Sequence, residues 1–393
     1  MAVGKKVLCI WGQGGGFGHA ARLFSIARAL SKGDYVLHLA LKDTSAARPF
    51  LGGFRGTISE CPVYRPIMAL SRQQASLADT MLLSGFGDPG TLQALTRAWQ
   101  ALYKETPPDV IIVDYAPAAL LAAVNLDCPR FITGNGFVTP APGYPLADWR
   151  PDRPSDKIVQ QTETLVLANI SRVLPHDARP PARLSDLFES NGCLLTSYPV
   201  LDSYNGLRHN ARYFAANLVE PSGEALQREY EIVCYLKPRF RGLASLAEGL
   251  RKSGRSALMM VPGLDDGVAA GLRGASLDVM TGFSDLESLL RNASLFIGHG
   301  NLNSLNQCLR MAIPMLLLPL QMENLNLPIL LRQAGFAVTG TGQESVTDWA
   351  QLIATTISDS SMREKLELHA AAHHITGTAA VGSRFRELLD AMR

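Results

Sequence analysis

The chain has 393 residues, of which 47% are hydrophobic and 18% charged, as in an ordinary globular protein of two or three domains. Its formal net charge of +2 lacks the basic excess of a nucleic-acid binder, and no apolar stretch reaches the ~18 residues of a transmembrane helix. The six cysteines show no CxxC pair and no metal-ligand spacing, and the first apolar run is too short for a signal peptide. We therefore expect reduced thiols and a cytoplasmic protein.

Short apolar runs alternate with helical segments through the first half of the chain. The predicted strands here are 6–12, 35–41, 108–115 and 129–135, and a helix is predicted over 19–33. Continuous apolar runs joined by helical crossovers indicate a parallel sheet that is covered on both faces.

The same alternation of apolar runs and helical segments occurs in the second half of the chain. The predicted strands there are 231–237, 256–263, 294–300 and 314–320, and the tail 383–392 is predicted to be an amphipathic helix. Segment 211–223 ends in Pro, Ser and Gly, which is typical of an interdomain linker. We predict an α/β protein with two doubly wound, Rossmann-like domains that face a cleft. The predicted parts are an N-terminal domain 1–215, a linker 216–230, a C-terminal domain 231–375 and a helix in 376–393 that packs back on the N-terminal domain.

The first glycine-rich turn is "GQGGGFGHAAR", residues 12–22, directly after the first predicted strand. Phe17 and His19 occupy the last position of the two G-x-G-x-x-G frames, so a dinucleotide fingerprint is incomplete, and no P-loop motif is present. The remaining interpretation is a tight turn that brings Gly18 and His19 to a helix N-terminus at the carboxyl edge of a sheet, where open α/β sheets bind ligands. A glycine turn with a capping histidine is the alternative.

A second polar turn, "GHGNLNSLNQCL", follows the apolar run "SLFI" at residues 298–309. The start of a helix is an anion site because its N–H groups are unpaired and its dipole end is positive. Glycines there let the backbone approach a ligand, and imidazole, amide and hydroxyl groups can donate to phosphate oxygens. These small and polar residues are Gly298, His299, Gly300, Asn303, Ser304 and, about one turn deeper, Gln307 near a ribose hydroxyl. We predict a cradle for a diphosphate with a sugar attached; a helix merely capped by Asn and Ser is the alternative.

Residues 298–338, "GHGNLNSLNQCLRMAIPMLLLPLQMENLNLPILLRQAGFAV", resemble the donor-binding signature of nucleotide-sugar glycosyltransferases of the GT-B fold, such as the UDP-glycosyltransferases. Pro314, Pro319, Glu323 and Gly335 fall in register with the family pattern without gaps. Weaker likeness extends over the whole chain, in "GFGHAARL", "PDVIIVD" and "NLVEP".

The resemblance implies a set of donor-binding residues. Phe283 falls where the family often has a Trp that stacks on the base, Gln307 stands where a ribose-binding Glu is usual, and Asn301 replaces a second Gly. Glu323 and Asn324 occupy the acidic-Gln pair that holds sugar hydroxyls, with Asn324 in place of Gln. Lys237 or Arg239, in a loop that replaces a small Gly-Ser loop, would contact phosphate. The complete set is Gly18, Lys237, Phe283, His299, Gly300, Asn301, Asn303, Ser304, Gln307, Glu323 and Asn324, and the expected donor carries UDP or TDP.

A pair of residues in the first half is the candidate for catalysis. His19 suits a general base because an unperturbed imidazole titrates near ~6.5, and a carboxylate would orient it. Asp114, at the carboxyl end of a neighbouring strand, is the candidate partner, and many relatives have a His–Asp pair at these positions. The chain has no D-x-D metal motif. We therefore expect a hexosyltransferase-type glycosyltransferase (EC 2.4) without metal or cofactor, and the family implies inversion of the anomeric centre.

Two other functions remain open. A sugar-nucleotide epimerase of the same fold usually has an acidic and Arg-rich N-terminal loop, which residues 12–22 lack. A non-catalytic nucleotide-sugar-binding protein would not need His19 and Asp114. The resemblance implies that the N-terminal domain binds the acceptor. Segments 64–90 and 134–149 are apolar or aromatic enough to wall an apolar small-molecule or lipid-linked acceptor, which leaves a peripheral membrane contact open; no nucleic-acid partner is expected.

Overall fold

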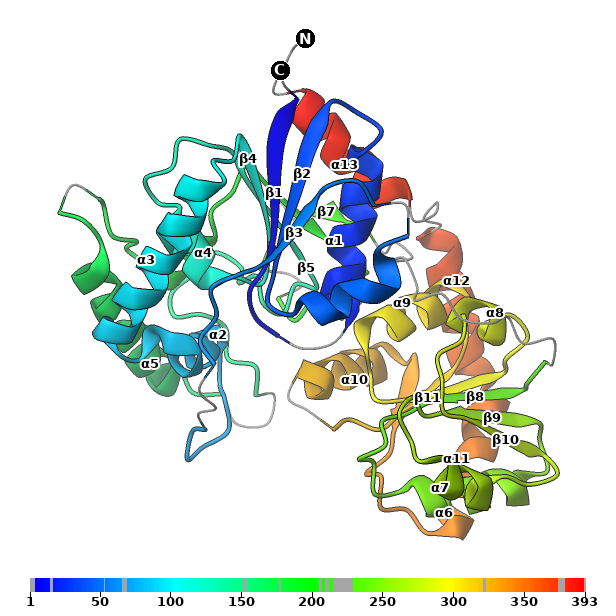
Figure 1. Ribbon diagram of the computed structural model, residues 1–393. Coiled ribbons are helices and arrows are strands. Elements are labelled where there is room, and N and C mark those ends of the chain that lie inside the picture. Colours follow the sequence, from blue (N-terminus) through cyan, green and yellow to red (C-terminus); the bar gives the residue numbers. More distant parts are fainter. Residues whose placement is uncertain are drawn as a thin grey trace. The chain divides into compact units, whose positions relative to one another are not determined.

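The computed structural model describes residues 4–14, 17–52, 54–65, 69–150, 154–176, 178–204, 207–208, 212–214, 229–320, 323–373 and 379–391, with the backbone alone at 17, 49, 323–325 and 379–382. The chain divides into two compact units (Figure 1). Unit 1 comprises Met1–Val219 and Gly377–Arg393, and unit 2 comprises Glu220–Thr376.

Unit 1 contains a seven-stranded parallel sheet with the order β3-β2-β1-β4-β5-β6-β7. Its strands are β1 Lys5–Trp11, β2 Tyr35–Leu41, β3 Thr57–Glu60, β4 Val110–Asp114, β5 Arg130–Gly134, β6 Gly192–Leu195 and β7 Arg212–Tyr213. The central strands are apolar at nearly every position because both faces of the sheet are covered, and β4 is buried along its whole length.

Helices cover both faces of this sheet and enclose one apolar cluster on each side. They are α1 Phe17–Leu30, α2 Leu77–Met81, α3 Pro89–Glu105, α4 Pro117–Ala122, α5 Asp156–Val173 and α13 Ala379–Asp390. Shorter helical turns are η1 Thr44–Phe50, η2 Leu82–Phe86, η3 Leu184–Phe188 and η4 Pro199–Leu201; η2 is a π-helix.

The last helix, α13, packs against α1, at the opposite end of the sequence (Figure 1). Its Phe385 and Leu389 are buried in the same apolar cluster as α1, and the ring of Phe385 meets the edge of Phe131 on β5 at 6.0 Å between centroids. The C-terminal helix therefore completes the core of unit 1.

Unit 2 contains a six-stranded parallel sheet with the order β10-β9-β8-β11-β12-β13. The strands are β8 Ile232–Tyr235, β9 Ala257–Met260, β10 Leu277–Met280, β11 Leu295–Gly298, β12 Met315–Leu317 and β13 Ala337–Thr339. The helices are α6 Leu243–Ser253, α7 Asp266–Leu272, α8 Leu286–Leu290, α9 Leu302–Arg310, α10 Glu323–Ala334, α11 Val346–Ser358 and α12 Ser360–Ala372.

Each sheet reverses its strand order at one point. In unit 1 the reversal lies between β1 and β4, which pair with Trp11 opposite Asp114. In unit 2 it lies between β8 and β11, which pair with Gly298 opposite Tyr235. Open α/β sheets bind ligands in the crevice outside the carboxyl ends of strands at such a point. The fold therefore places both polar turns singled out in the sequence at switch points.

The sequence analysis did not predict five of the strands, each of two to four residues: β3, β6, β7, β10 and β13. Strand β7 falls at the start of segment 211–223, which was expected to be linker; residues 211 and 215–223 of that segment lie outside the described residues. None of the helices in the described part of the chain has the length and apolar content needed to cross a bilayer.

Candidate active site

His19 and Asp114 meet in unit 1 as the sequence predicts. Nδ1 of His19 lies 3.0 Å from Oδ1 of Asp114. The imidazole is on the first turns of α1 and the carboxylate is on the last residue of β4, so the contact joins two elements at the switch point. Both residues are buried, with Asp114 fully inaccessible. A carboxylate at Nδ1 favours a hydrogen on that nitrogen and leaves Nε2 as the acceptor.

Arg22 is a third member of this cluster, and it was not predicted. Its Nη1 donates to Oδ2 of Asp114 at 2.5 Å, and its Nε donates to Oγ1 of Thr196 at 2.6 Å. The Thr196 hydroxyl in turn donates to the carbonyl of Gly134 at 3.1 Å. The signal in the sequence was the spacing: residues three apart on a helix share a face, so His19 and Arg22 reach the same carboxylate.

The charge of Asp114 is stabilised by its neighbours. Burial alone would raise the pKa of the Asp114 carboxyl, but the charges of Arg22 and His19 and their hydrogen bonds outweigh it, so that the net pKa lies below the ordinary value. Asp114 is therefore an anion at neutral pH inside the core of unit 1.

The imidazole of His19 is fixed on its other sides by β1 and the turn after it. The Trp11 ring stacks on it at 5.4 Å between centroids, with 12° between the planes. Gly14 has φ +79°, and a Cβ built on it would lie 2.6 Å from Nε2 of His19. Tyr115, directly after Asp114, also has a positive φ of 53°, and its ring centroid lies 6.2 Å from that of His19. A left-handed conformation on a bulky residue is rare and is concentrated at functional sites.

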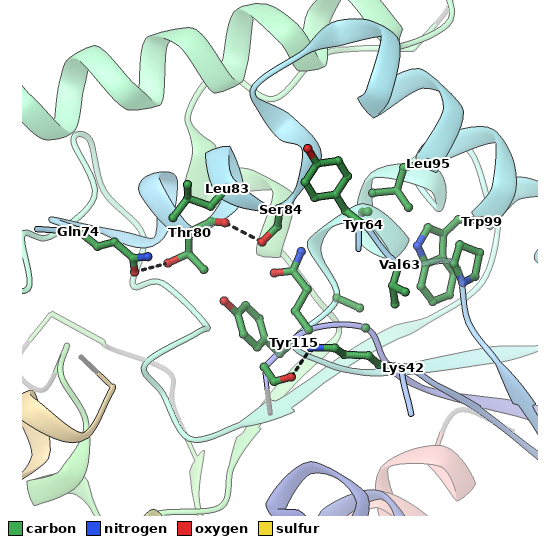
Figure 2. Close-up of a pocket in the computed structure, with 16 residues that line it drawn as sticks. Lys42, Val63, Tyr64, Gln74, Thr80, Leu83, Ser84, Leu95, Trp99 and Tyr115 are labelled. Carbon is green, nitrogen blue, oxygen red and sulfur yellow. Dashed lines mark hydrogen bonds between the residues drawn. The ribbon is translucent and has the colours of Figure 1, made fainter. Parts of the chain in front are cut away.

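A cavity of about 300 Å³ adjoins this cluster, at the low end of the size range of small-molecule sites (Figure 2). It is lined by Gly12, Gln13, Gly14, Lys42, Pro62, Val63, Tyr64, Gln74, Thr80, Leu83, Ser84, Leu95, Trp99, Tyr115, Ala116 and Ala118. Gly14 and Tyr115 belong both to this lining and to the contacts of His19.

The cavity wall is mainly apolar and aromatic. Figure 2 shows Tyr64, Leu95 and Trp99 on one side of it and Gln74 and Thr80 on the other. Segment 64–90 was expected to wall an acceptor site and supplies five lining residues. Segment 134–149, the second expected wall, supplies none of the lining residues; its Phe137 and Trp149 stack on each other at 4.1 Å and are buried in the core.

In unit 2, the turn after β11 leads directly into α9. Asn301 is the N-cap residue of this nine-residue helix, and Gly300 before it has φ +79°. Asn303 and Ser304 lie in the first turn, Ser304 being buried, and Gln307 follows one turn deeper, also buried. Lys237 and Arg239, from the loop after β8, add positive charge near His299. A helix start with two cations beside it suits an anionic ligand.

The phosphate contact predicted for His299 stays a prediction, and both of its ring nitrogens lie close to backbone groups. Its Nδ1 lies 2.7 Å from the carbonyl of Leu318, and its Nε2 accepts a hydrogen bond from the backbone N–H of Lys237 at 3.0 Å. Burial lowers the pKa of His299 to about 4; the bond to Leu318 acts in the opposite direction, and the charges of Lys237 and Arg239 lower it further. A neutral imidazole that donates from Nδ1 and accepts at Nε2 has no hydrogen left for a phosphate oxygen. In this state His299 connects the loops that follow β8, β11 and β12.

The remaining predicted donor residues are placed as follows. Phe283, between β10 and α8, is 38% exposed, as a residue that stacks on a base needs to be. Gly18 lies in α1 and is exposed, in unit 1 rather than in unit 2 with the other donor residues. Glu323 and Asn324 begin α10, and their side chains lie outside the described residues. Within the described residues, no group of three or more His, Cys, Asp or Glu side chains has the arrangement of a metal site.

Comparison with known proteins adds evidence on the fold. No protein-family model and no curated protein sequence matches the chain. Among solved structures, the calicheamicin glycosyltransferase CalG4 is similar with a TM-score of 0.70 at 13% identity, over 99% of each chain. The glycosyltransferase VinC in complex with DTDP has a TM-score of 0.67 at 13% identity, over 98% of this chain and 100% of its own. The spinosyn rhamnosyltransferase SpnG complexed with spinosyn aglycone has a TM-score of 0.64 at 15% identity, over 97% and 99%.

The chain has the fold of these glycosyltransferases. The α/β class with two doubly wound units, predicted from the sequence as GT-B, is confirmed by this likeness over nearly the whole chain. At 13–15% identity the likeness concerns the fold, so the chemistry of the chain has to be argued from its own residues.

Proposed function

We propose that the protein is a glycosyltransferase that moves a sugar from a nucleoside diphosphate sugar to a hydroxyl group of a small acceptor. One observation carries the proposal: His19 is bonded through Nδ1 to the buried carboxylate of Asp114, while its Nε2 faces Gly14, which lines the cavity. A general base must reach the proton that it removes, and Gly14 lies both beside Nε2 of the ring and in the lining of a cavity of ligand size.

The chemistry assigned to unit 1 is proton removal. The acceptor hydroxyl lies in the cavity and gives its proton to Nε2 of His19, and the Asp114 carboxylate stabilises the imidazolium that forms. The acceptor oxygen bonds to the anomeric carbon, and the bond from that carbon to the diphosphate oxygen breaks. A single displacement of this kind inverts the anomeric centre, as the resemblance implies. No step in this scheme requires a metal.

The chemistry assigned to unit 2 is donor binding. The N–H groups at the start of α9, the hydroxyl of Ser304, the amides of Asn301 and Asn303, and the charges of Lys237 and Arg239 together suit a diphosphate, whose negative charge grows as the sugar leaves. Phe283 would stack on the base, Gln307 would bind the ribose, and Glu323 and Asn324 would bind the sugar. The complex of VinC with DTDP supports a donor that carries TDP, and UDP is the alternative that the resemblance implies.

The cavity in unit 1 supports an apolar acceptor. Its walls are largely aromatic and aliphatic, and a hydroxyl-bearing ring system would bury its apolar faces against Tyr64, Leu95 and Trp99. The complex of SpnG with an aglycone supports a small-molecule acceptor. Unit 1 is thus proposed as the acceptor-binding part, with the helix of 376–393 in its core, and residues 231–375 as the donor-binding part.

A donor panel tests the proposal directly. The protein is incubated with UDP- and TDP-sugars, with and without a set of hydroxylated aromatic acceptors, and release of the nucleoside diphosphate is measured. We expect release that rises with acceptor, slow release without it, and loss of both in His19→Ala. Interconversion of donor sugars would identify an epimerase. Donor binding without release or interconversion would identify a binding protein.

A further inference from the structure

The carboxylate that orients His19 is shared between two partners. Oδ1 of Asp114 faces the imidazole and Oδ2 faces the guanidinium of Arg22, so that each oxygen has its own donor. The Arg22 side chain is 5% exposed and that of Asp114 is inaccessible, so water does not screen this ion pair. Interactions between charges are much stronger in such a setting than at the surface.

Arg22 is itself held at a second point. Its Nε donates to Thr196, whose hydroxyl donates to Gly134. Thr196 follows β6, Gly134 ends β5 and Asp114 ends β4, so the guanidinium ties α1 to the carboxyl ends of three neighbouring strands. An arginine can do this because its planar fork offers several donors in a fixed geometry, whereas a lysine is a point charge.

The charges in this cluster decide how readily His19 takes up a proton. Asp114 and Arg22 already balance each other, so a proton on the imidazole adds an uncompensated positive charge in the core of unit 1. Without Arg22, the same proton would be balanced by Asp114 alone. Among the described neighbours of the His19 ring, Trp11 is neutral, Tyr115 is a phenol, and Lys42 reaches the turn by donating to the Gly14 carbonyl at 2.7 Å. Asp114 is thus the charged group bonded to this ring, and Arg22 is the cation bonded to the other oxygen of the same carboxylate.

We propose that Arg22 is a positioning residue for the His19–Asp114 pair: it holds the Asp114 carboxylate in place as an anion and offsets its pull on the His19 proton. This inference rests on the proposed role of His19 as the general base. The addition to that role is that Arg22, a buried cation that never touches substrate, keeps the imidazole of His19 ready to accept a proton.

The test is the pH–rate profile of Arg22→Gln beside that of the parent. A carboxylate within ~4–6 Å shifts the titration of a cationic group by about 1–3 units, and Arg22 offsets this effect of Asp114 on His19. Removing Arg22 should therefore move the acid limb of kcat to higher pH by about one unit or more, with activity recovered at alkaline pH. Arg28→Gln is the matched control, because Arg28 is on the same helix but donates to the carbonyls of Phe50 and Gly52. Its limb should coincide with that of the parent.

A stably folded Arg22→Gln protein whose limb coincides with that of the parent overturns the inference. If Arg22→Gln does not fold, Arg22→Lys decides, because a lysine keeps the charge but cannot bind both Asp114 and Thr196. Its limb should stay in place and its acceptor KM should be unchanged, while kcat per folded molecule falls several-fold; a kcat equal to that of the parent overturns the inference.

His19→Ala, measured in the same series, distinguishes a failure of the proposed role of Arg22 from a failure of the proposed role of His19. If His19→Ala loses turnover but Arg22→Gln keeps the parent's limb, only the role of Arg22 fails. If His19→Ala keeps near-normal turnover, the proposed base itself is wrong.

Discussion

Gly14 and His19 are so close that no side chain fits between them. A Cβ on Gly14 would lie 2.6 Å from Nε2 of His19 and 3.1 Å from the ring of Tyr115. Gly14 also has φ +79°, a conformation that disfavours every residue with a Cβ. The glycine after β1 is thus needed both for the turn and for access to the reactive side of the imidazole.

Gly14→Ala should therefore displace His19. We expect a loss of about 1–2 kcal/mol in the free energy of unfolding from the left-handed backbone alone, and a fall in turnover beyond that stability loss. Gly18→Ala is the matched control for stability, because a Cβ there meets no heavy atom within 4 Å and the residue is helical. It should be as stable as the parent or slightly more stable. Equal stability losses in the two variants would contradict this account of the turn.

Substitutions of Asp114 and of His19 should differ in their effects on activity and on stability. His19→Ala should lower kcat by ~10²–10⁴-fold, the usual contribution of a general base, while the Kd for the nucleoside diphosphate changes little, because the diphosphate is assigned to α9. Asp114→Asn should cost less activity than His19→Ala but more stability, because it leaves the buried Arg22 cation unpaired, a loss of ~3–5 kcal/mol. Turnover and thermal unfolding measured on the same preparations test both statements.

The control for Asp114 is Asp109, which directly precedes the same strand. Asp109 is exposed and accepts a hydrogen bond from the backbone of Lys6. Asp109→Asn should leave turnover as in the parent. If Asp114→Asn is no less stable than Asp109→Asn, the buried charge pair with Arg22 does not contribute the stability assigned to it.

The sequence predicted the strands that lie in continuous apolar runs, including the three-residue β12 within "PMLLLPL", but not the strands whose runs are short or mixed. Strands such as β2, a seven-residue run, are recognisable because burial on both faces demands continuous apolar residues. Strands β13, "AVT", and β7, "RY", are short and partly exposed, so they show neither a period nor a continuous apolar run. Their pairing is decided by the neighbours that the rest of the fold supplies.

The site could be predicted only where its partners come from recognisable motifs. His19 and Asp114 each end or begin an element, and the parallel sheet brings them together. The partners of His299 are backbone groups of Lys237 and Leu318, which any side chain at those positions would supply. No residue pattern encodes such contacts, so the sequence could not predict them, and the role of His299 at the phosphate stays a prediction.

Filling the cavity should affect the acceptor and not the donor. Leu83, on the π-helix η2, lines the cavity and is partly exposed, so Leu83→Trp has room to enter it. We expect a rise in acceptor KM of about tenfold or more, equivalent to ~1.4 kcal/mol or more, with donor Kd unchanged. Leu165→Trp, on the exposed side of α5, is the control and should keep the parent's KM. An unchanged acceptor KM in Leu83→Trp would place the acceptor elsewhere.

Ser304 offers the most direct test of the phosphate cradle. Ser304→Ala removes one hydroxyl from the first turn of α9 and should weaken UDP or TDP binding by ~1–3 kcal/mol, because a hydrogen bond to a charged oxygen is lost. Ser253→Ala is the matched control, since its hydroxyl bonds to Leu250 at the end of α6, which leads to the opposite edge of the sheet. Calorimetric Kd values that are equal for both variants would remove α9 from the donor site.

The buried imidazole of His299 should make the protein sensitive to acid. The unfolded chain binds this proton near pH ~6.5, whereas burial holds the pKa in the folded protein at about 4. Between these values the unfolded chain binds more protons, so stability falls as the pH is lowered through this window. From pH 7 to pH 5 the loss from this residue should be about 2 kcal/mol.

His299→Gln should abolish that part of the acid sensitivity. The variant is expected to be less stable than the parent at pH 7, because a glutamine amide does not reproduce the bonds to Lys237 and Leu318. Its further loss between pH 7 and pH 5 should nevertheless be smaller by about 2 kcal/mol, because nothing at position 299 then titrates. Urea unfolding of the parent and of His299→Gln at pH 7 and at pH 5 measures the two losses in stability. The unfolding transition to compare is the one that His299→Gln shifts at pH 7. His176→Gln, at an exposed histidine, should retain the acid sensitivity of the parent. Equal losses in the parent and His299→Gln would mean that the folded protein binds a proton at position 299 as readily as the unfolded chain does, so that by pH 5 Nε2 carries a hydrogen and does not accept from the Lys237 N–H.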